Sequence, residues 1–496
     1  MIRRFQILFF AIFIFIYADT VAQQMLVSSA AQDDFSLGYT KVIGQDENGY
    51  FVLTSNLSLN IITDRQGFKS RKYKAGYFNT TLNRQWEVDV NAQPNDATID
   101  AISFFNGKIM VISSLPDKAA KKLKYYITFI DATGKENKIP NPVVEFNVVA
   151  GEYEKCKVVI STSAEKFALV TREFLGDKNQ PVFGAVINSD LATEQIKSGL
   201  IPFSEKTFDF EGYALSNNGD LVLLGLHSEK IKTLSSKRKN DYFIYSSPHD
   251  TAGFKEFNIS GDKLITGLGI AFDNINQQAV MAGFYSDKES FIGAGIYYAT
   301  LKMESNNEVT IKASSIDTQQ NIRLKGERNS GSGINLISYP IERIVVRQDG
   351  GAVLVAEAAY TTEYSFYDTF SQSFTRRIEY NFDNVIIISI NSSGKADWSS
   401  IVDKQQVSLD DGGIYSSFCS LLNSEQLVII YNDDIGRRNK IVPASINNLG
   451  VMTRMKPFTQ SEGSQLFPRS GKQVSENEFV VPALVKRKLH LIKFTF

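Results

Sequence analysis

The sequence predicts an all-β protein made of eight similar units, and three observations support this expectation. Apolar segments of strand length alternate with polar turns along the chain, and helical periodicity is almost absent. A hydrophobic hairpin with a polar turn recurs at intervals of roughly 50 to 75 residues. A second hairpin follows it after a short stretch, so one unit holds four strands. The turns of the first hairpins comprise residues 47–49, 106–107, 164–165, 217–219, 273–276, 349–351, 424–425 and 476–477.

The unit that begins near residue 415 shows the pattern most clearly. The alternating residues of 415–422 are followed, after a polar turn, by strands at 427–431, 441–446 and 451–458. The turn between the last two strands, residues 447–450, reads Asn-Asn-Leu-Gly, and Asn and Gly supply the positive φ that tight hairpins need. We therefore expect each unit to be a four-stranded antiparallel meander.

Four-stranded units repeated head to tail are typical of a β-propeller, in which each unit forms one blade of a ring. The last unit contains only three strands, at 472–474, 478–485 and 489–496. We expect residues 24–30, which precede the first unit, to supply the missing fourth strand and close the ring. The sequence thus predicts an eight-bladed β-propeller closed by an N-terminal strand, with seven blades as the alternative.

The first residues have the pattern of a secretory signal peptide. Two arginines precede an apolar run at 5–17, and small residues at 20–22 offer a cleavage site. The run is too short for a membrane anchor, and no later segment approaches the length of a transmembrane helix. We expect residues 1–22 to be removed and residues 23–496 to form a single propeller domain. The mature protein would be exported and would be periplasmic, outer-membrane associated or extracellular.

Composition narrows the range of functions. With 43% hydrophobic residues the chain can bury a large core, and a formal net charge of -1 gives no general attraction to nucleic acid or acidic lipid. Cys156 and Cys419 fall near the innermost strands of opposite blades, so we expect two separate thiols. Three histidines argue against a histidine-rich zinc site or a His-dependent catalytic triad. We expect no cofactor, no metal, no nucleic-acid partner and a monomer.

The longest insertions are expected on one face of the ring. Strand direction alternates within a blade, so loops between second and third strands emerge on the same side as loops between blades. The insertions at 315–342 and 357–384 both belong to this group, and loops on a rigid scaffold often carry binding residues. The second insertion is rich in aromatic residues: Tyr360, Tyr364, Phe366, Tyr367, Phe370, Phe374, Tyr380 and Phe382. These rings either contact a sugar or a partner protein, or fold down and are buried against the ring.

We therefore expect a binding surface on the loop face of blades five to seven. The candidate binding residues are Tyr364, Tyr367, Arg376, Arg377, Lys404 and Asp411. The preferred function is a noncatalytic binding or scaffolding module at the cell envelope, or outside it, that recognises a protein or polysaccharide partner. Basic residues also gather at 65–74, 118–124, 230–239 and 486–488, where they either keep the surface soluble or hold an anionic partner.

Carboxylates offer an alternative function from another class. Asp100, Glu211 and Glu342 stand where the chain enters the innermost strand of a blade, and Asp410 and Asp411 lie in a nearby connection. Two carboxyl groups about 5 to 10 Å apart can cleave a glycosidic bond. A carbohydrate-active hydrolase or lyase is therefore the alternative, and it requires two of these groups to converge.

Two resemblances accompany these patterns. The segments 384–398, 410–413 and 431–433, with Gln405, are similar to a group of uncharacterised exported bacterial β-propeller proteins, which implies the fold and no activity. Residues 394–398, Gly-Lys-Ala-Asp-Trp, resemble the Gly-Lys-x-x-Trp element of quinoprotein-like eight-bladed propellers. Only Trp86 and Trp398 occupy the tryptophan position, so the tryptophan girdle of that family is missing and a quinone cofactor is not implied.

Overall fold

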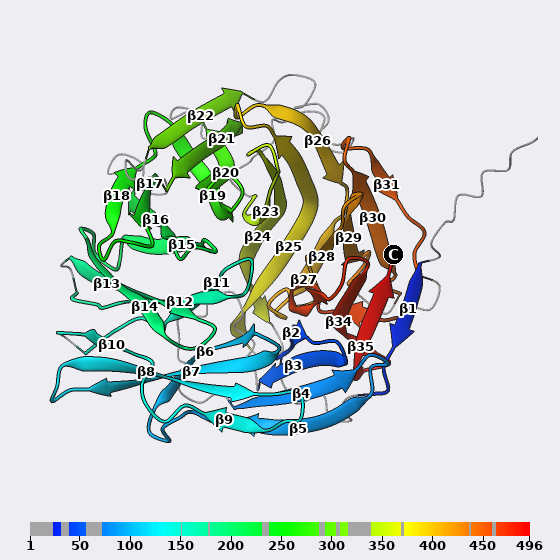
Figure 1. Ribbon diagram of the computed structural model, residues 1–496. Helices are drawn as coiled ribbons and strands as arrows, with labels where there is room; N and C mark the ends of the chain where they lie inside the picture. The colour runs from blue at the N-terminus through cyan, green and yellow to red at the C-terminus, as the bar shows by residue number, and fades with distance from the viewer. Residues whose placement is uncertain are drawn as a thin grey trace, which may run out of the picture.

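In a computed structural model, eight antiparallel sheets stand around a common centre, which confirms the predicted eight-bladed β-propeller (Figure 1). The structure describes residues 23–30, 39–55, 72–149, 151–176, 179–230, 238–286, 293–303, 308–315, 339–368, 372–435, 438–458 and 463–496. The proposed signal peptide, residues 1–22, lies outside these ranges. Within them, the structure contains no helix that is long and apolar enough to span a bilayer.

The first four blades follow one another along the chain. Blade 1 contains β2 (Tyr39–Gln45), β3 (Gly49–Ser55), β4 (Tyr73–Asn79) and β5 (Arg84–Val90). Blade 2 contains β6 (Thr98–Phe105), β7 (Lys108–Asp117), β8 (Lys122–Ile130) and two short outer strands, β9 (Glu136–Lys138) and β10 (Val144–Asn147). Blade 3 contains β11 (Lys157–Ile160), β12 (Lys166–Arg172), β13 (Gln180–Asn188) and β14 (Thr193–Ile201). Blade 4 contains β15 (Phe208–Leu215), β16 (Leu221–Lys230), β17 (Arg238–Ser247) and β18 (Lys255–Asn258).

The remaining blades complete the ring. Blade 5 contains β19 (Leu264–Asp273), β20 (Gln278–Ser286), β21 (Gly293–Lys302) and β22 (Val309–Ser315). Blade 6 contains β23 (Ile341–Val346), β24 (Ala352–Asp368), β25 (Ser373–Ile390), β26 (Ala396–Val402) and β27 (Gln406–Leu409). Blade 7 contains β28 (Phe418–Leu422), β29 (Gln426–Asn432), β30 (Ile441–Asn447) and β31 (Met452–Arg454). Blade 8 contains β32 (Gln465–Leu466), the 3₁₀ helix η5 (Pro468–Ser470), β33 (Lys472–Gln473), β34 (Glu478–Val485) and β35 (Lys488–Thr495), with β1 (Gln24–Val27) as its outer strand.

The N-terminal strand closes the ring as the sequence predicts. Strand β1 pairs antiparallel with β35, with Gln24 opposite Thr495, and the two strands lie side by side in Figure 1. Just beyond β1, the Ser28 hydroxyl accepts a hydrogen bond from the Leu491 N–H at 2.9 Å. Side chains of blades 1 and 8 share one buried cluster: Val42, Tyr50, Val52, Phe78, Leu82, Val474, Val480 and Leu491. The last blade is thus built from both ends of the described chain and packs on the first.

The hydrophobic core lies between the blades. Every residue of β20 is buried, because neighbouring blades cover both faces of this sheet. Met281 packs in a cluster with Leu224 of blade 4, whereas the next residue, Ala282, packs in a cluster with Leu354 of blade 6. Side chains alternate across a strand, so a continuous apolar run serves two interfaces at once. This explains why the middle strands appear in the sequence as unbroken hydrophobic segments.

Two tryptophans dock one blade on the next. In β5, the indole N–H of Trp86 donates to the Ala132 carbonyl of blade 2 at 2.7 Å, and its ring covers Gly134. In β26, Trp398 donates to the Asn448 carbonyl of blade 7 at 3.1 Å. A Cβ placed on Gly450 would lie 2.6 Å from the Trp398 ring, and this glycine has a φ of +76°. The outer-strand tryptophan therefore requires glycine in the turn of the following blade.

The cysteines confirm a further expectation about the ring. Cys156 precedes β11 in blade 3, and Cys419 lies in β28 of blade 7. Both are free and buried. Burial raises the pKa of each thiol well above its ordinary value, so neither has the thiolate character of a reactive cysteine.

Blade 6 departs from the others because its middle hairpin is much longer. Strands β24 and β25 remain paired from Ala352 opposite Ile390 out to Asp368 opposite Ser373, and in Figure 1 they run across the middle of the ring. The insertion 357–384 therefore extends this hairpin, as predicted. Strand β27 adds a third strand along part of β25, with Phe382 opposite Gln406. Most of the other predicted insertion, residues 316–338, lies outside the described residues.

Candidate functional site

The outer half of the blade-six hairpin exposes large aromatic side chains. Tyr364 and Tyr367 are 41% and 51% exposed, and Phe366 and Phe374 are 41% and 76% exposed. Nearer the ring, Tyr380 and Phe382 are buried, and Phe370 lies outside the described residues. Burial against the ring, one of the two alternatives drawn from the sequence, thus applies to Tyr380 and Phe382. Tyr360, opposite Asn381 in the same half, is 46% exposed, so the half close to the ring is packed down only in part, and the outer half faces solvent.

The strand register distributes these rings over both faces of the hairpin. Tyr364 lies opposite Arg377, so these two side chains share one face. Tyr367 lies opposite Phe374 on the other face, and their rings meet edge to face with centroids 5.2 Å apart. Phe374 was not among the predicted site residues, because its position opposite Tyr367 depends on the register of the hairpin.

The arginines of the hairpin are held by acidic neighbours. Arg376 forms an ion pair with Glu363 across the hairpin, and Arg377 forms one with Asp410 at the end of β27. The Ile378 N–H also donates to Asp410, and this hydrogen bond with the Arg377 contact lowers the pKa of the Asp410 carboxyl. All four charged side chains are at least one-third exposed, so these pairs fix geometry and contribute little stability.

Asp411 and Lys404 differ in position from the other four predicted site residues. Asp411 is half-buried and accepts hydrogen bonds from the Ser408 hydroxyl at 2.6 Å and the Gly413 N–H at 2.8 Å, so it shapes the turn after β27. Lys404 is only 5% exposed. The structure therefore brings Tyr364, Tyr367, Arg376 and Arg377 together on the hairpin and places the Lys404 ammonium in the interior.

Lys404 belongs to a buried charged cluster where the hairpin leaves the ring. Its Nζ lies 2.6 Å from Oε1 of Glu357, and both side chains are essentially inaccessible to water. Nζ also donates to the Phe382 carbonyl and to the Gln406 side chain. The other oxygen of Glu357 accepts from the Ser417 hydroxyl at 2.6 Å, before blade 7. This role of Lys404 could not be predicted from the sequence, because it depends on four segments that are separated along the chain.

Three of the channel carboxylates that the enzyme alternative names lie in different blades. Asp100 accepts hydrogen bonds from the Ser114 hydroxyl and the Cys156 N–H, and burial raises its pKa. Burial also raises the pKa of Glu342, whose nearest cation is Arg469 at 3.1 Å. Glu211 is an exposed residue, but protein around its carboxyl group removes part of its hydration. This partial desolvation, followed by the charge of Asp209, raises the pKa of Glu211. These three carboxylates lie in blades 2, 4 and 6, each with its own partners.

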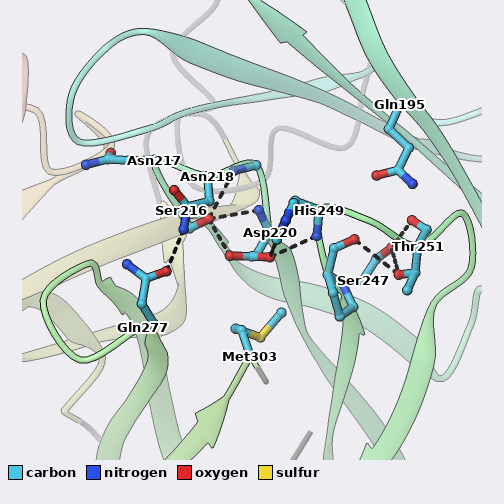
Figure 2. A network of polar contacts seen from close by, with 12 residues as sticks. Gln195, Ser216, Asn217, Asn218, Asp220, Ser247, His249, Thr251, Gln277 and Met303 are labelled. Atoms are coloured by element: carbon cyan, nitrogen blue, oxygen red, sulfur yellow. Dashed lines mark hydrogen bonds and ion pairs between the residues drawn. The ribbon is translucent and has the colours of Figure 1, made fainter. Parts of the chain in front are cut away.

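A polar network at the turns of blades 4 and 5 contains serine, aspartate and histidine but has no catalytic arrangement (Figure 2). The buried Asp220 carboxylate accepts from the Ser216 hydroxyl at 2.7 Å and lies 2.9 Å from Nδ1 of His249. A triad would place histidine between serine and aspartate, whereas here aspartate lies between the other two. The network therefore anchors a turn. No group of three potential metal-ligating His, Cys, Asp or Glu residues occurs in the described ranges.

A pocket in the channel is the second candidate site. It has a volume of about 610 Å³ and lies among the innermost segments of blades 6, 7 and 8. Its charged lining consists of Glu342, Arg343, Arg469 and Lys472. Only the acidic member of this group, Glu342, was among the candidate residues predicted from the sequence. The basic members come from two blades and form no cluster along the chain, so only the fold brings them together.

The loop lysines that suggested a basic surface are partly neutralised. Lys122 forms an ion pair with Glu145, and Lys124 forms one with Asp117 at 2.9 Å. Residues 56–71 and 231–237, which carry other basic residues of these loops, lie outside the described residues.

Comparison with known proteins adds distant structural likenesses only. No protein-family model and no curated protein matches the sequence. Sqt1 of Chaetomium thermophilum, solved with the N-terminus of ribosomal protein L10, is 12% identical with a TM-score of 0.42, covering 92% of this chain and 96% of Sqt1. The polysaccharide lyase Uly1 is 10% identical with a TM-score of 0.33, covering 93% and 99%. The β-propeller domain of the Trilobed protease from Pyrococcus furiosus is 9% identical with a TM-score of 0.34, covering 87% and 98%. Likenesses of this strength carry no argument about function.

Proposed function

We propose that the protein is a noncatalytic binding or scaffolding module that contacts a partner protein through the outer half of the blade-six hairpin. The observation that carries this proposal is the exposure of four aromatic rings on a regular, paired strand extension. Soluble proteins rarely leave such a group of large apolar side chains in water without a use for it. Tyrosine and arginine are also the residues that most often dominate binding energy at protein interfaces.

The geometry favours a protein partner over a polysaccharide. Sugar rings bind to a flat aromatic face, whereas the Tyr367 and Phe374 rings at the outer end are nearly perpendicular, with 67° between their planes. Rings on both faces of the hairpin suit insertion into a cleft of a partner, where both faces become buried. The adjoining strand β27 holds part of the hairpin, which lowers the entropy lost on binding.

A comparison of two double variants tests the proposed surface. Tyr367→Ser with Phe374→Ser removes the apolar end of the hairpin, whereas Leu449→Ser with Val451→Ser removes two comparably exposed apolar side chains at the β30–β31 turn. Each protein would be immobilised and exposed to cell-envelope extract, and captured proteins would be identified and then purified for affinity measurements. We expect the hairpin variant to lose at least tenfold in affinity for the purified partner, and the control variant to stay within twofold.

The result that would overturn the proposal is equal binding by both variants and the unmodified protein. A second outcome is that the protein captures no protein partner and binds a polysaccharide on a glycan array, with weaker binding by the hairpin variant. That result would support the proposed surface but would show that its partner is a polysaccharide. Turnover of a polysaccharide by the unmodified protein would instead support the enzyme alternative.

Export to the cell envelope or beyond is part of the same proposal. Its support is the pattern of two arginines, an apolar run and small residues before Gln23. N-terminal sequencing of the protein from its native cells should begin at Gln23. A mature protein that retains residues 1–22 would contradict this expectation.

A further inference from the structure

We propose that the channel pocket between blades 6, 7 and 8 binds a small molecule that carries at least two negative charges on phosphate or carboxylate groups. The pocket volume of about 610 Å³ lies within the range of small-molecule sites. The site is separate from the hairpin residues proposed for protein binding, so the two proposals stand or fall independently.

The charged side chains that line the pocket are mostly cationic. Three cationic side chains, Arg343, Arg469 and Lys472, face one carboxylate, Glu342. The Arg469 guanidinium forms an ion pair with that carboxylate at 3.1 Å and also lies 3.7 Å from the Glu357 carboxylate. The two remaining cations therefore have no counter-charge in the pocket lining.

Among the residues that the structure describes, Arg343 and Lys472 form hydrogen bonds with neutral groups only. The Arg343 guanidinium donates to the Ser420 hydroxyl at 3.1 Å, and the Lys472 ammonium donates to the Ile43 carbonyl at 2.7 Å. Both acceptors are neutral. Within the described ranges, neither cation forms an ion pair with a carboxylate, and each has donor groups left for a ligand.

A lysine of blade 1, Lys41, lies close enough to Lys472 to repel it. Lys41 lies in β2, two residues before the carbonyl that Lys472 contacts. Burial lowers the pKa of Lys472, and the charge of Lys41 lowers it further. Burial also lowers the pKa of Lys41 and of Arg343. Lys41 and Lys472 are exposed and repel each other, and Arg343 is half-buried, so a bound anion would offset both the repulsion and the burial of a charge.

The chemistry of these groups indicates the kind of ligand. A guanidinium presents a planar fork of donors that matches two oxygens of a carboxylate or phosphate, and an ammonium adds a point charge. The three cations Arg343, Lys472 and Lys41 together favour a ligand with more than one negative charge over a simple halide. Phosphate and succinate are the simplest probes of the two chemistries.

Calorimetric titration with inorganic phosphate and, separately, with succinate tests the proposal. Both titrations would be run at constant ionic strength set with potassium chloride, because screening alone weakens any anion binding. We expect saturable binding of at least one probe at one site per chain. Arg343→Gln and Lys472→Met should each weaken it by at least tenfold. The matched control Lys118→Gln, which removes a positive charge from an exposed loop, should change it by less than twofold.

Two results would overturn the proposal. They are no saturable binding of either probe, and binding that all three variants weaken equally. The thermal unfolding midpoint of each variant without anion would be measured alongside. If Arg343→Gln fails to fold, Lys472→Met and the phosphate-induced rise in the midpoint of the unmodified protein keep the test decisive.

Discussion

Replacing Glu357 by glutamine removes one charge from the buried ion pair at the base of the hairpin and leaves the shape of the side chain almost unchanged. The two charges lie 2.6 Å apart with both side chains inaccessible to water. At an effective dielectric constant of about 20, their attraction is about 6 kcal/mol. Lys404 keeps its hydrogen bonds to Phe382 and Gln406, which offset part of the loss. We therefore expect Glu357→Gln to lower the free energy of unfolding by about 3 to 5 kcal/mol.

The measurement is denaturant unfolding at pH 7, followed by circular dichroism and tryptophan fluorescence, whose coincidence would justify a two-state treatment. The Lys404→Met replacement completes a double-mutant cycle, because the double variant contains neither charge. We expect the double variant to be more stable than Glu357→Gln by at least about 2 kcal/mol, since no unpaired charge remains buried. Glu363→Gln, which breaks the exposed pair with Arg376, is the control and should cost less than about 1 kcal/mol.

Two results would refute this reasoning. The first is a loss below about 1 kcal/mol for Glu357→Gln, which would mean that water or a rearranged side chain compensates Lys404. The second is a double variant whose loss equals the sum of the single losses, which would mean that the two groups do not interact.

Two further predictions concern blade docking and pH. Gly450→Ala should cost at least about 1 kcal/mol more than Gly107→Ala, measured by denaturant unfolding, because both glycines have positive φ but only Gly450 would clash, with Trp398. Equal losses would contradict the proposed tryptophan docking. Lys197 is buried, and burial lowers its pKa to about 8 in the folded protein. Between pH 8 and the ordinary pKa of a lysine, the unfolded chain therefore binds the Lys197 proton more tightly than the folded protein does. Relative to Lys197→Met, the unmodified protein should gain about 2 to 3 kcal/mol between pH 7.5 and pH 10. A constant difference would mean that the Lys197 pKa is not lowered.

Most of the fold could be predicted because propeller blades repeat a local pattern. Turns such as Asn106-Gly107 mark hairpins by their own chemistry, and apolar runs such as β20 mark strands covered on both sides. The closing strand β1 was predictable from the shortage of one strand in the last unit. These patterns depend on short segments of sequence, so they can be recognised without knowledge of the three-dimensional structure.

The candidate site was predictable only in part, because burial and register decide which residues face outward. Tyr367 and Arg376 were found from composition, since aromatic and basic residues crowd the extension. Lys404 was misplaced at the surface, because a lysine in a polar connection is usually solvated and its buried partner Glu357 lies 47 residues earlier. The basic side of the channel was missed, because Lys41 and Lys472 meet only when the first and last blades are joined.

The pairing of β1 with β35 also has a consequence for biogenesis. Ser28 and Leu491 are 463 residues apart, and the Ser28 N–H donates to the Leu491 carbonyl while the Leu491 N–H donates to the Ser28 hydroxyl. On a ribosome this pair cannot form until the residues between its two members have been synthesised, which takes on the order of tens of seconds. During that interval blade 1 has a neighbouring blade on one side only, and its apolar surface that later meets blade 8 is uncovered. A holding chaperone that shields this surface would therefore be expected to raise the yield of folded protein.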